Sequence, residues 1–424
     1  MPKTSWYCAI IIFLFWAAAF NSSAQVNYLH ERVSGWSSDI DTMLSLMKTQ
    51  HYIYRSNPLP QQLLEDAKIL KTKISQYSDE RMLGELERLM FYMHDGHSYI
   101  LPVARNINSF YLPVHFYIFS DGVYIIDADE PNKDLIGCKV ESIHGVAVTK
   151  LVNDMNAYIH HDNIYTVKWL GASVLRFRSV YEWYGLPAGS SDITINLIDK
   201  NNNAITRKLS FIPATDFHGI PKLFSNKLQD NISAPLYLSN VTDNYWFKVL
   251  PEKKVFYFQF NQVYDKDNET IAAFALKLDS ALQIEKPKLF IIDVRHNNGG
   301  NSGLLPPLLD VIKQFERANS NSKIIVITGR NTFSAAQIFI SLINKETHAL
   351  FAGEPSSSSP NFVGEENYIL LPFSGAMGSI SNKYHETIAG DKRKYIEPDY
   401  PVFLSSTAYF KNQDPVIEFI LTIK

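Results

Sequence analysis

The segment from Tyr245 to Asn344 constrains the fold most, because its pattern alternates between strands and helices. Short apolar runs rich in β-branched residues are each followed by a stretch in which apolar residues recur at helical spacing. The pattern predicts strand Val255–Phe260, helix Thr270–Leu282, strand Leu289–Val294, helix 303–316, strand Ile324–Thr328 and helix Ala335–Asn344. This alternation is typical of a layered α/β domain.

The preceding part of the chain has two other patterns. Residues 36–93 have helical spacing, interrupted at Asn57–Pro60 and again near Ser78. Residues 110–212 contain shorter runs of strand character, such as Val123–Ile126 and Ile193–Ile198, separated by turn residues. We therefore expect a helical unit, a strand-rich unit and the α/β unit, with a linker rich in Ser, Asn and Asp before the last.

Composition excludes several classes of function. Hydrophobic residues make up 46% and charged residues 20% of the chain, which indicates globular units rather than a disordered chain. The net charge of -3 provides no basic excess for a nucleic-acid backbone. The chain has 2 cysteines, too few for a disulfide framework or a cysteine-rich metal site. No metal or cofactor is expected from ligand spacing.

The amino terminus has the pattern of a secretory signal. Lys3 precedes the apolar run Ala9–Phe20, and small residues at Ser22 and Ala24 follow it. A helix of that length spans about 18 Å, which is short of a bilayer core. We expect cleavage after Ala24 and export to the periplasm or the extracellular space, without stable membrane insertion.

Two turns after predicted strands are candidate sites for chemistry. In "LFIIDVRHNNGGNSG" a strand is followed by Gly299 and Gly300, which allow a backbone to approach a ligand closely. In "IIVITGRNTFSAAQIFISLI" Ser334 begins a helix. A serine there is commonly a helix cap, and the same position also suits a nucleophile. Spacing alone leaves both interpretations open.

A serine nucleophile needs a base, and the chain has 12 histidines. His97 in "MHDGHSYILP" follows a predicted helix end and precedes an apolar strand. His94 and His115 are alternatives that spacing does not separate from it.

These segments, in their order along the chain, resemble the C-terminal-processing (tail-specific) serine proteases, in the branch similar to the tricorn core protease. The resemblance rests on "DGHSYI", "LIGCKVESIHGVAV", "VFYFQFN", "IIDVRHNNGG", "TFSAAQIF", "FAGEPSSSSPNFVGE" and "IEPDYPV". It implies an α/β fold with a crotonase-like β-β-α protease core, an N-terminal helical domain and a PDZ-like middle domain. The implied ranges are 1–24 signal peptide, 25–105 helical domain, 106–215 PDZ-like domain, 216–243 linker and 244–424 protease core.

The resemblance also implies roles for individual residues. Ser334 corresponds to the nucleophile and His97 to the general base. The backbone amides of Ala335 and of Gly299 or Gly300 would form the oxyanion hole.

The sequence departs from the family's pattern at positions that bear on the catalytic residues. Ser359 stands where the Ser–Lys branch has its lysine, so a Ser–Lys mechanism would require Lys383 to reach the site from another loop. Lys392 stands where tricorn-like members have a glutamate. We therefore predict neighbouring Asp391 as the orienting acid, with Glu365 as the alternative.

The predicted function is a serine-type endopeptidase that acts on a protein or peptide and needs no cofactor. The alternative is a non-catalytic binding protein for peptides or hydrophobic ligands, because the interphotoreceptor retinoid-binding protein resembles this core and carries hydrophobic ligands. The sequence leaves the substrate, the cleavage specificity and the oligomeric state open.

Overall fold

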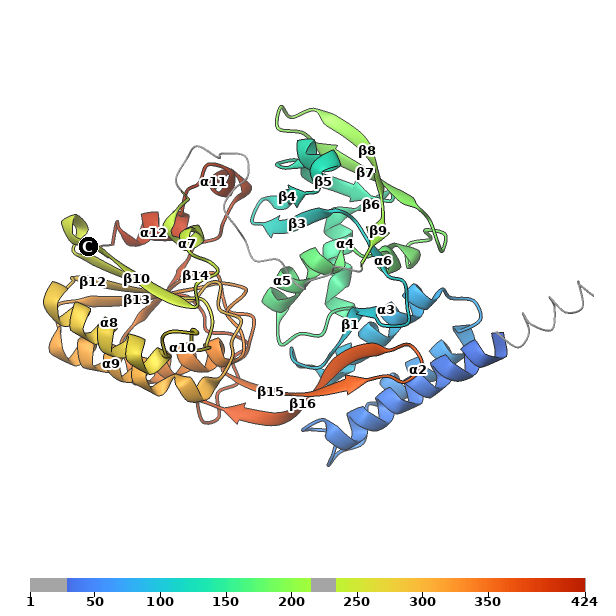
Figure 1. Ribbon diagram of the computed structural model, residues 1–424, viewed down its shortest axis with the longest axis horizontal. Helices are drawn as coiled ribbons and strands as arrows, with labels where there is room; N and C mark the ends of the chain where they lie inside the picture. Colours follow the sequence, from blue (N-terminus) through green and yellow to red (C-terminus); the bar gives the residue numbers. More distant parts are fainter. Residues whose placement is uncertain (1–28, 215–233, 424) are drawn as a thin grey trace, which may run out of the picture.

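The computed structural model describes residues 29–214 and 234–423 (Figure 1). The predicted signal segment, residues 1–24, lies outside the described residues. No helix in the described ranges is long and apolar enough to cross a membrane. The architecture is mixed α/β, as the sequence pattern predicts.

The α/β unit is built on one six-stranded sheet in the order β10-β11-β12-β13-β14-β17. Strand β10 is antiparallel to β11, and the remaining neighbours are parallel. The strands are β10 (Tyr245–Leu250), β11 (Val255–Phe260), β12 (Leu289–Asp293), β13 (Lys323–Thr328), β14 (Leu350–Gly353) and β17 (Tyr400–Pro401).

Helices cover both faces of this sheet (Figure 1). One face packs its phenylalanines against α8 (Ile271–Glu285), α9 (Pro306–Ala318) and α10 (Ala335–Glu346). The opposite face packs against α12 (Pro415–Ile420), and α7 (Leu236–Ser239) and α11 (Ser406–Phe410) lie nearby. Because the parallel strands are buried on both faces, they have the continuous apolar runs that made them recognisable in the sequence.

The middle unit is an antiparallel sheet in the order β3-β4-β5-β7-β8, with β6 paired to β5. Its buried face forms a separate hydrophobic core with the helices of this unit. The elements are β2 (Phe110–Tyr111), β3 (Val114–Phe119), β4 (Gly122–Ala128), η2 (Glu130–Leu135), β5 (Lys139–Ile143), β6 (Val146–Ala147), α4 (Val148–Asp154), η3 (Met155–Ala157), α5 (Ile164–Val174), α6 (Arg178–Glu182), β7 (Asp192–Ile198), β8 (Ala204–Ser210) and β9 (Ile212–Pro213).

The helical unit comprises a helix over 29–50, then α2 (Gln61–Lys73), α3 (Asp79–Met90) and η1 (Phe91–Met93). The predicted interruptions are confirmed: turns occupy 51–60, and Ser78 caps α3 by accepting a hydrogen bond from the amide of Arg81. Strand β1 (Tyr99–Ala104) follows after a turn over 94–98.

The sequence did not predict how this helical unit is completed. A long hairpin from the C-terminal part, β15 (Asn361–Leu370) and β16 (Ala376–Glu386), extends to it, and β16 pairs antiparallel with β1 (Figure 1). Ile369, Leu371, Ala376 and Ile380 of this hairpin join the core of the helices. The hairpin therefore fixes the turn before β1, which contains His97, relative to the α/β unit.

Candidate active site

Ser334 occupies a strained position at the start of α10. Its backbone has φ 56 and ψ -123, a conformation that costs a non-glycine residue about 1–3 kcal/mol. Its side chain makes no capping hydrogen bond, unlike a serine that serves as an ordinary N-cap. Flanking contacts hold the turn: the amide of Phe333 donates to the carbonyl of Asn297 (3.1 Å), and Thr332 Oγ1 donates to the carbonyl of Val294 (2.9 Å).

The glycine turn after β12 lies against Ser334. A Cβ on Gly299 would come within 2.7 Å of the Cβ of Ser334, and its φ of +110 favours glycine. The amide of Gly299 donates to Asn297 Oδ1 at 3.0 Å. Among the described residues, the amides of Gly300 and Ala335 have no hydrogen-bond acceptor. These two amides therefore retain their donors for a ligand.

His97 lies beside the serine turn. Its ring stacks on Phe333 (centroids 4.3 Å apart) and on Phe362 (5.3 Å), and it is 4% exposed. Neither ring nitrogen has a hydrogen-bond partner among the described residues, so Ser334 and His97 are not hydrogen-bonded to each other. Burial lowers the pKa of His97 to about 4, and the charge of Asp95 opposes that shift. The imidazole is therefore neutral at pH 7 and able to accept a proton.

The carboxylate of Asp95 anchors the turn that contains His97. Its Oδ1 accepts from the amides of His97 (2.8 Å) and Ser98 (2.6 Å) and from Ser381 Oγ (2.6 Å). Its Oδ2 accepts from His51 Nε2 (2.9 Å) and Ser98 Oγ (2.8 Å). Burial alone raises the pKa of Asp95, but the hydrogen bonds from His51, Ser381 and Ser98 outweigh it, and the net pKa is lowered. An ionised carboxylate is thus held behind His97.

A cavity of about 790 Å³ joins these elements. Its walls include both proposed catalytic side chains, both glycines, and aromatic and aliphatic side chains from β1, α5 and α10. Three glutamates line the cavity: Glu87, Glu365 and Glu366. None of the described lining residues is a lysine or arginine.

Comparisons with known proteins place this geometry in a known fold. No family model matches the chain, and no curated protein matches it. Among solved structures, mature CPAF complexed with lactacystin matches with a TM-score of 0.65 at 12% identity, covering 92% of this chain and 97% of that one. A serine-to-alanine mutant of CPAF matches with a TM-score of 0.61 at 12% identity, covering 90% and 95%. The chain has the CPAF fold. The resemblance predicted from sequence is thereby confirmed at the level of the fold.

Two sequence-predicted side chains lie elsewhere in this CPAF-like fold. The carboxylate of Asp391 accepts hydrogen bonds from the side chain of Arg393 (2.6 Å) and from its amide (2.9 Å), and Asp391 does not line the cavity. Lys383 is also absent from the lining and lies 3.6 Å from Glu365, with which it forms an ion pair. Ser359 Oγ donates to the carbonyl of Lys394 at 3.2 Å. The structure thus brings together Ser334, His97, Gly299, Gly300, Ala335 and Glu365, and does not bring Asp391 or Lys383 to them.

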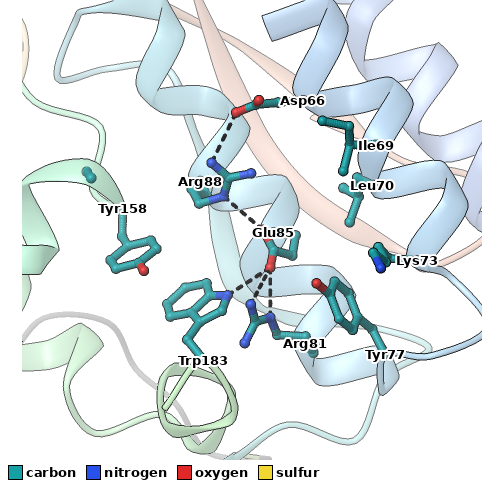
Figure 2. A pocket seen from close by; sticks show the side chains of 11 residues that line it. Asp66, Ile69, Leu70, Lys73, Tyr77, Arg81, Glu85, Arg88, Tyr158 and Trp183 are labelled. Carbon is teal, nitrogen blue, oxygen red and sulfur yellow. Dashed lines mark hydrogen bonds and ion pairs between the residues drawn. The ribbon is translucent and has the colours of Figure 1, made fainter. Parts of the chain in front are cut away.

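A second cavity of about 350 Å³ lies between the helical and middle units (Figure 2), and it shares no lining residue with the cavity that contains Ser334. Glu85 is its central acid and accepts from Arg81 Nε (2.7 Å), Arg88 Nε (2.8 Å) and Trp183 Nε1 (2.9 Å). Arg88 also donates to Asp66 at 3.2 Å. Because these charges are paired with one another, we interpret this network as one that stabilises the interface between the two units.

Proposed function

We propose that the protein is an exported serine endopeptidase that hydrolyses peptide bonds by acyl transfer. The observation that supports this most is the backbone of Ser334, which is held in a strained conformation with its hydroxyl free of any capping role. Strain of this kind persists where surrounding structure enforces it, and it is common at functional sites. The turn presents the hydroxyl to a cavity that also contains a neutral imidazole.

In the proposed reaction, His97 takes the proton of Ser334 Oγ as the oxygen attacks the scissile carbonyl. The amides of Gly300 and Ala335 donate to the oxyanion that forms. His97 then gives its proton to the leaving amine. The same imidazole deprotonates a water molecule that attacks the acyl-enzyme, and it returns this proton to Ser334 Oγ as the ester bond breaks and the acid product leaves. The imidazolium that exists between these steps is stabilised by the charge of Asp95, whose influence raises the pKa of His97. Asp95 therefore takes the supporting part in this proposal in place of Asp391.

The finer features of the fold belong to this proposal as well. The six-stranded sheet with α8, α9 and α10 would be the crotonase-like core, and the β3–β8 unit would be the PDZ-like domain. The domain ranges 25–105, 106–215 and 244–424 are part of it, with hairpin β15–β16 reaching from the last to the first. CPAF was crystallised with lactacystin, which makes lactacystin a suitable probe for this cavity.

The experiment is intact-mass labelling with a fluorophosphonate. We expect one adduct on the wild type and none on Ser334→Ala, while Ser302→Ala, which removes another serine from the cavity wall, remains labelled. Equal labelling of wild type and Ser334→Ala would exclude Ser334 as the nucleophile.

A non-catalytic binding function is the second candidate. It is favoured by the missing hydrogen bond between Ser334 and His97 and by the many apolar side chains that line the cavity. A folded wild type that is not labelled, yet binds peptides or hydrophobic ligands, would support this second function.

A further inference from the structure

Glu87 is an unusual residue in the wall of the proposed active-site cavity. It lies on α3 and is 6% exposed, and its carboxyl has no hydrogen bond or ion pair with any described residue. Burial alone raises its pKa to about 8, without a contribution from any other charged group. Buried carboxyl groups are ordinarily paired, so a solitary one in a cavity wall indicates a missing partner.

The other residues that line the cavity indicate the chemistry of that partner. Two further carboxyl groups, Glu365 and Glu366, line the same cavity, and none of the described lining residues is a lysine or arginine. Glu365 is already paired with Lys383, which lies outside the lining, whereas Glu87 lacks a cation among the described residues. Leu170, Val174 and Phe177 also line it and provide apolar surface of the kind that covers the methylene stem of a long side chain. A stem that packs on apolar walls and ends in a cation complements this arrangement.

We propose that Glu87 determines specificity by accepting a basic side chain of the substrate, that of lysine or arginine, in the cavity that contains Ser334. The proposal rests on the proposed function and names its substrate class. When the cation binds, the Glu87 carboxyl gives up its proton to solvent and pairs with the bound charge. Apolar walls exclude water from this pair, which strengthens the interaction.

The first test measures binding without requiring catalysis. Benzamidine carries a planar cation on an apolar ring, and benzamide is its neutral counterpart. We expect calorimetry to show that the wild type binds benzamidine at least tenfold more tightly than benzamide. Glu87→Gln should lose that difference. Glu65→Gln, an exposed glutamate on α2, should retain it.

A proton count makes this test specific. At pH 7 the carboxyl of Glu87 is mostly protonated, so benzamidine binding should release close to one proton from the wild type and none from Glu87→Gln. Calorimetry in two buffers of different ionisation enthalpy measures this number. Equal affinity for benzamidine and benzamide in the wild type, or the same proton release in both proteins, would overturn the proposal.

The second test measures cleavage. We expect kcat/KM for a peptide with lysine to exceed that for the same peptide with norleucine by at least tenfold. Glu87→Gln should abolish this preference, and Glu65→Gln should keep both the preference and fluorophosphonate labelling. Labelling without a preference for lysine would refute the specificity pocket and leave the peptidase standing. Selective benzamidine binding by an unlabelled wild type would refute the peptidase and leave the cation site standing.

Discussion

Replacing Glu87 by glutamine should stabilise the protein at neutral pH. Glutamine has nearly the same shape as a protonated glutamate, so the cavity wall should be preserved. The folded state keeps the Glu87 proton up to a pH of about 8, whereas an unfolded chain loses it near the ordinary value of 4.5. As the pH rises between these values, the unfolded state is stabilised by ionisation and the folded state is not.

The magnitude follows from this difference in proton affinity. Each pH unit between the two values is worth about 1.4 kcal/mol of stability. From pH 4.5 to pH 7 the unfolding free energy of the wild type should therefore fall by about 3 kcal/mol relative to that of Glu87→Gln. The protonated Glu87 carboxyl contributes its full stability at pH values below its pKa in the unfolded chain. This contribution is lost as the pH rises toward its pKa in the folded protein.

Urea unfolding of both proteins at several pH values measures this effect. The quantity to compare is the difference in unfolding free energy between Glu87→Gln and the wild type, because other titrating groups cancel in it. Glu65→Gln, in which an exposed glutamate on α2 is changed, is the matched control. If the difference for Glu87→Gln does not change between pH 5 and pH 7, the Glu87 carboxyl is ionised in the folded protein, contrary to this prediction.

Three further predictions concern the serine turn and its histidine. The rate of fluorophosphonate labelling should fall on the acid side with a midpoint near pH 4, because protonation of His97 removes the base; a midpoint near the ordinary 6.5 would show that the ring is not buried. Asp95→Asn should lower the free energy of urea unfolding by about 3 kcal/mol, because it breaks the buried pair with His51. It should also move the midpoint of the labelling rate to lower pH, because the charge of Asp95 raises the pKa of His97. An unchanged midpoint would show that Asp95 has only a structural role. Gly299→Ala should lower the labelling rate about 100-fold, because the added Cβ would lie 2.7 Å from that of Ser334; unchanged labelling would show that the turn moves without consequence.

The sequence predicted the elements whose signals are local. Strands Val255–Phe260 and Ile324–Thr328 were recognisable because both faces of the sheet are covered, which requires continuous apolar runs. Ser334 was identified as a helix start, but helix capping and nucleophilic attack place serine at the same position. The backbone dihedral angles and the missing capping bond separate Ser334 from an ordinary cap and support the proposed role as nucleophile.

The remaining features depend on contacts between distant residues. Nothing in the local sequence indicates that His51 and Ser381 both bind the carboxylate of Asp95, because these residues lie 44 and 286 positions away from it along the chain. For the same reason Asp391 and Glu365 were predicted from the sequence as candidate acids, and Asp95, the carboxylate that the structure places near His97, was missed. Glu87 had a usable signal: with Leu83, Leu86 and Met90 it occupies the apolar stripe of α3.

Hairpin β15–β16 has a consequence for the order of events during synthesis. The nucleophile turn is complete once α10 has been made, but the strand that holds the His97 turn in place, Ala376–Glu386, is translated later. A ribosome-bound chain therefore contains both proposed catalytic side chains before the scaffold that brings them together exists. The proposed peptidase would be inactive while it is being synthesised, and would begin to act only after nearly the whole polypeptide has been released.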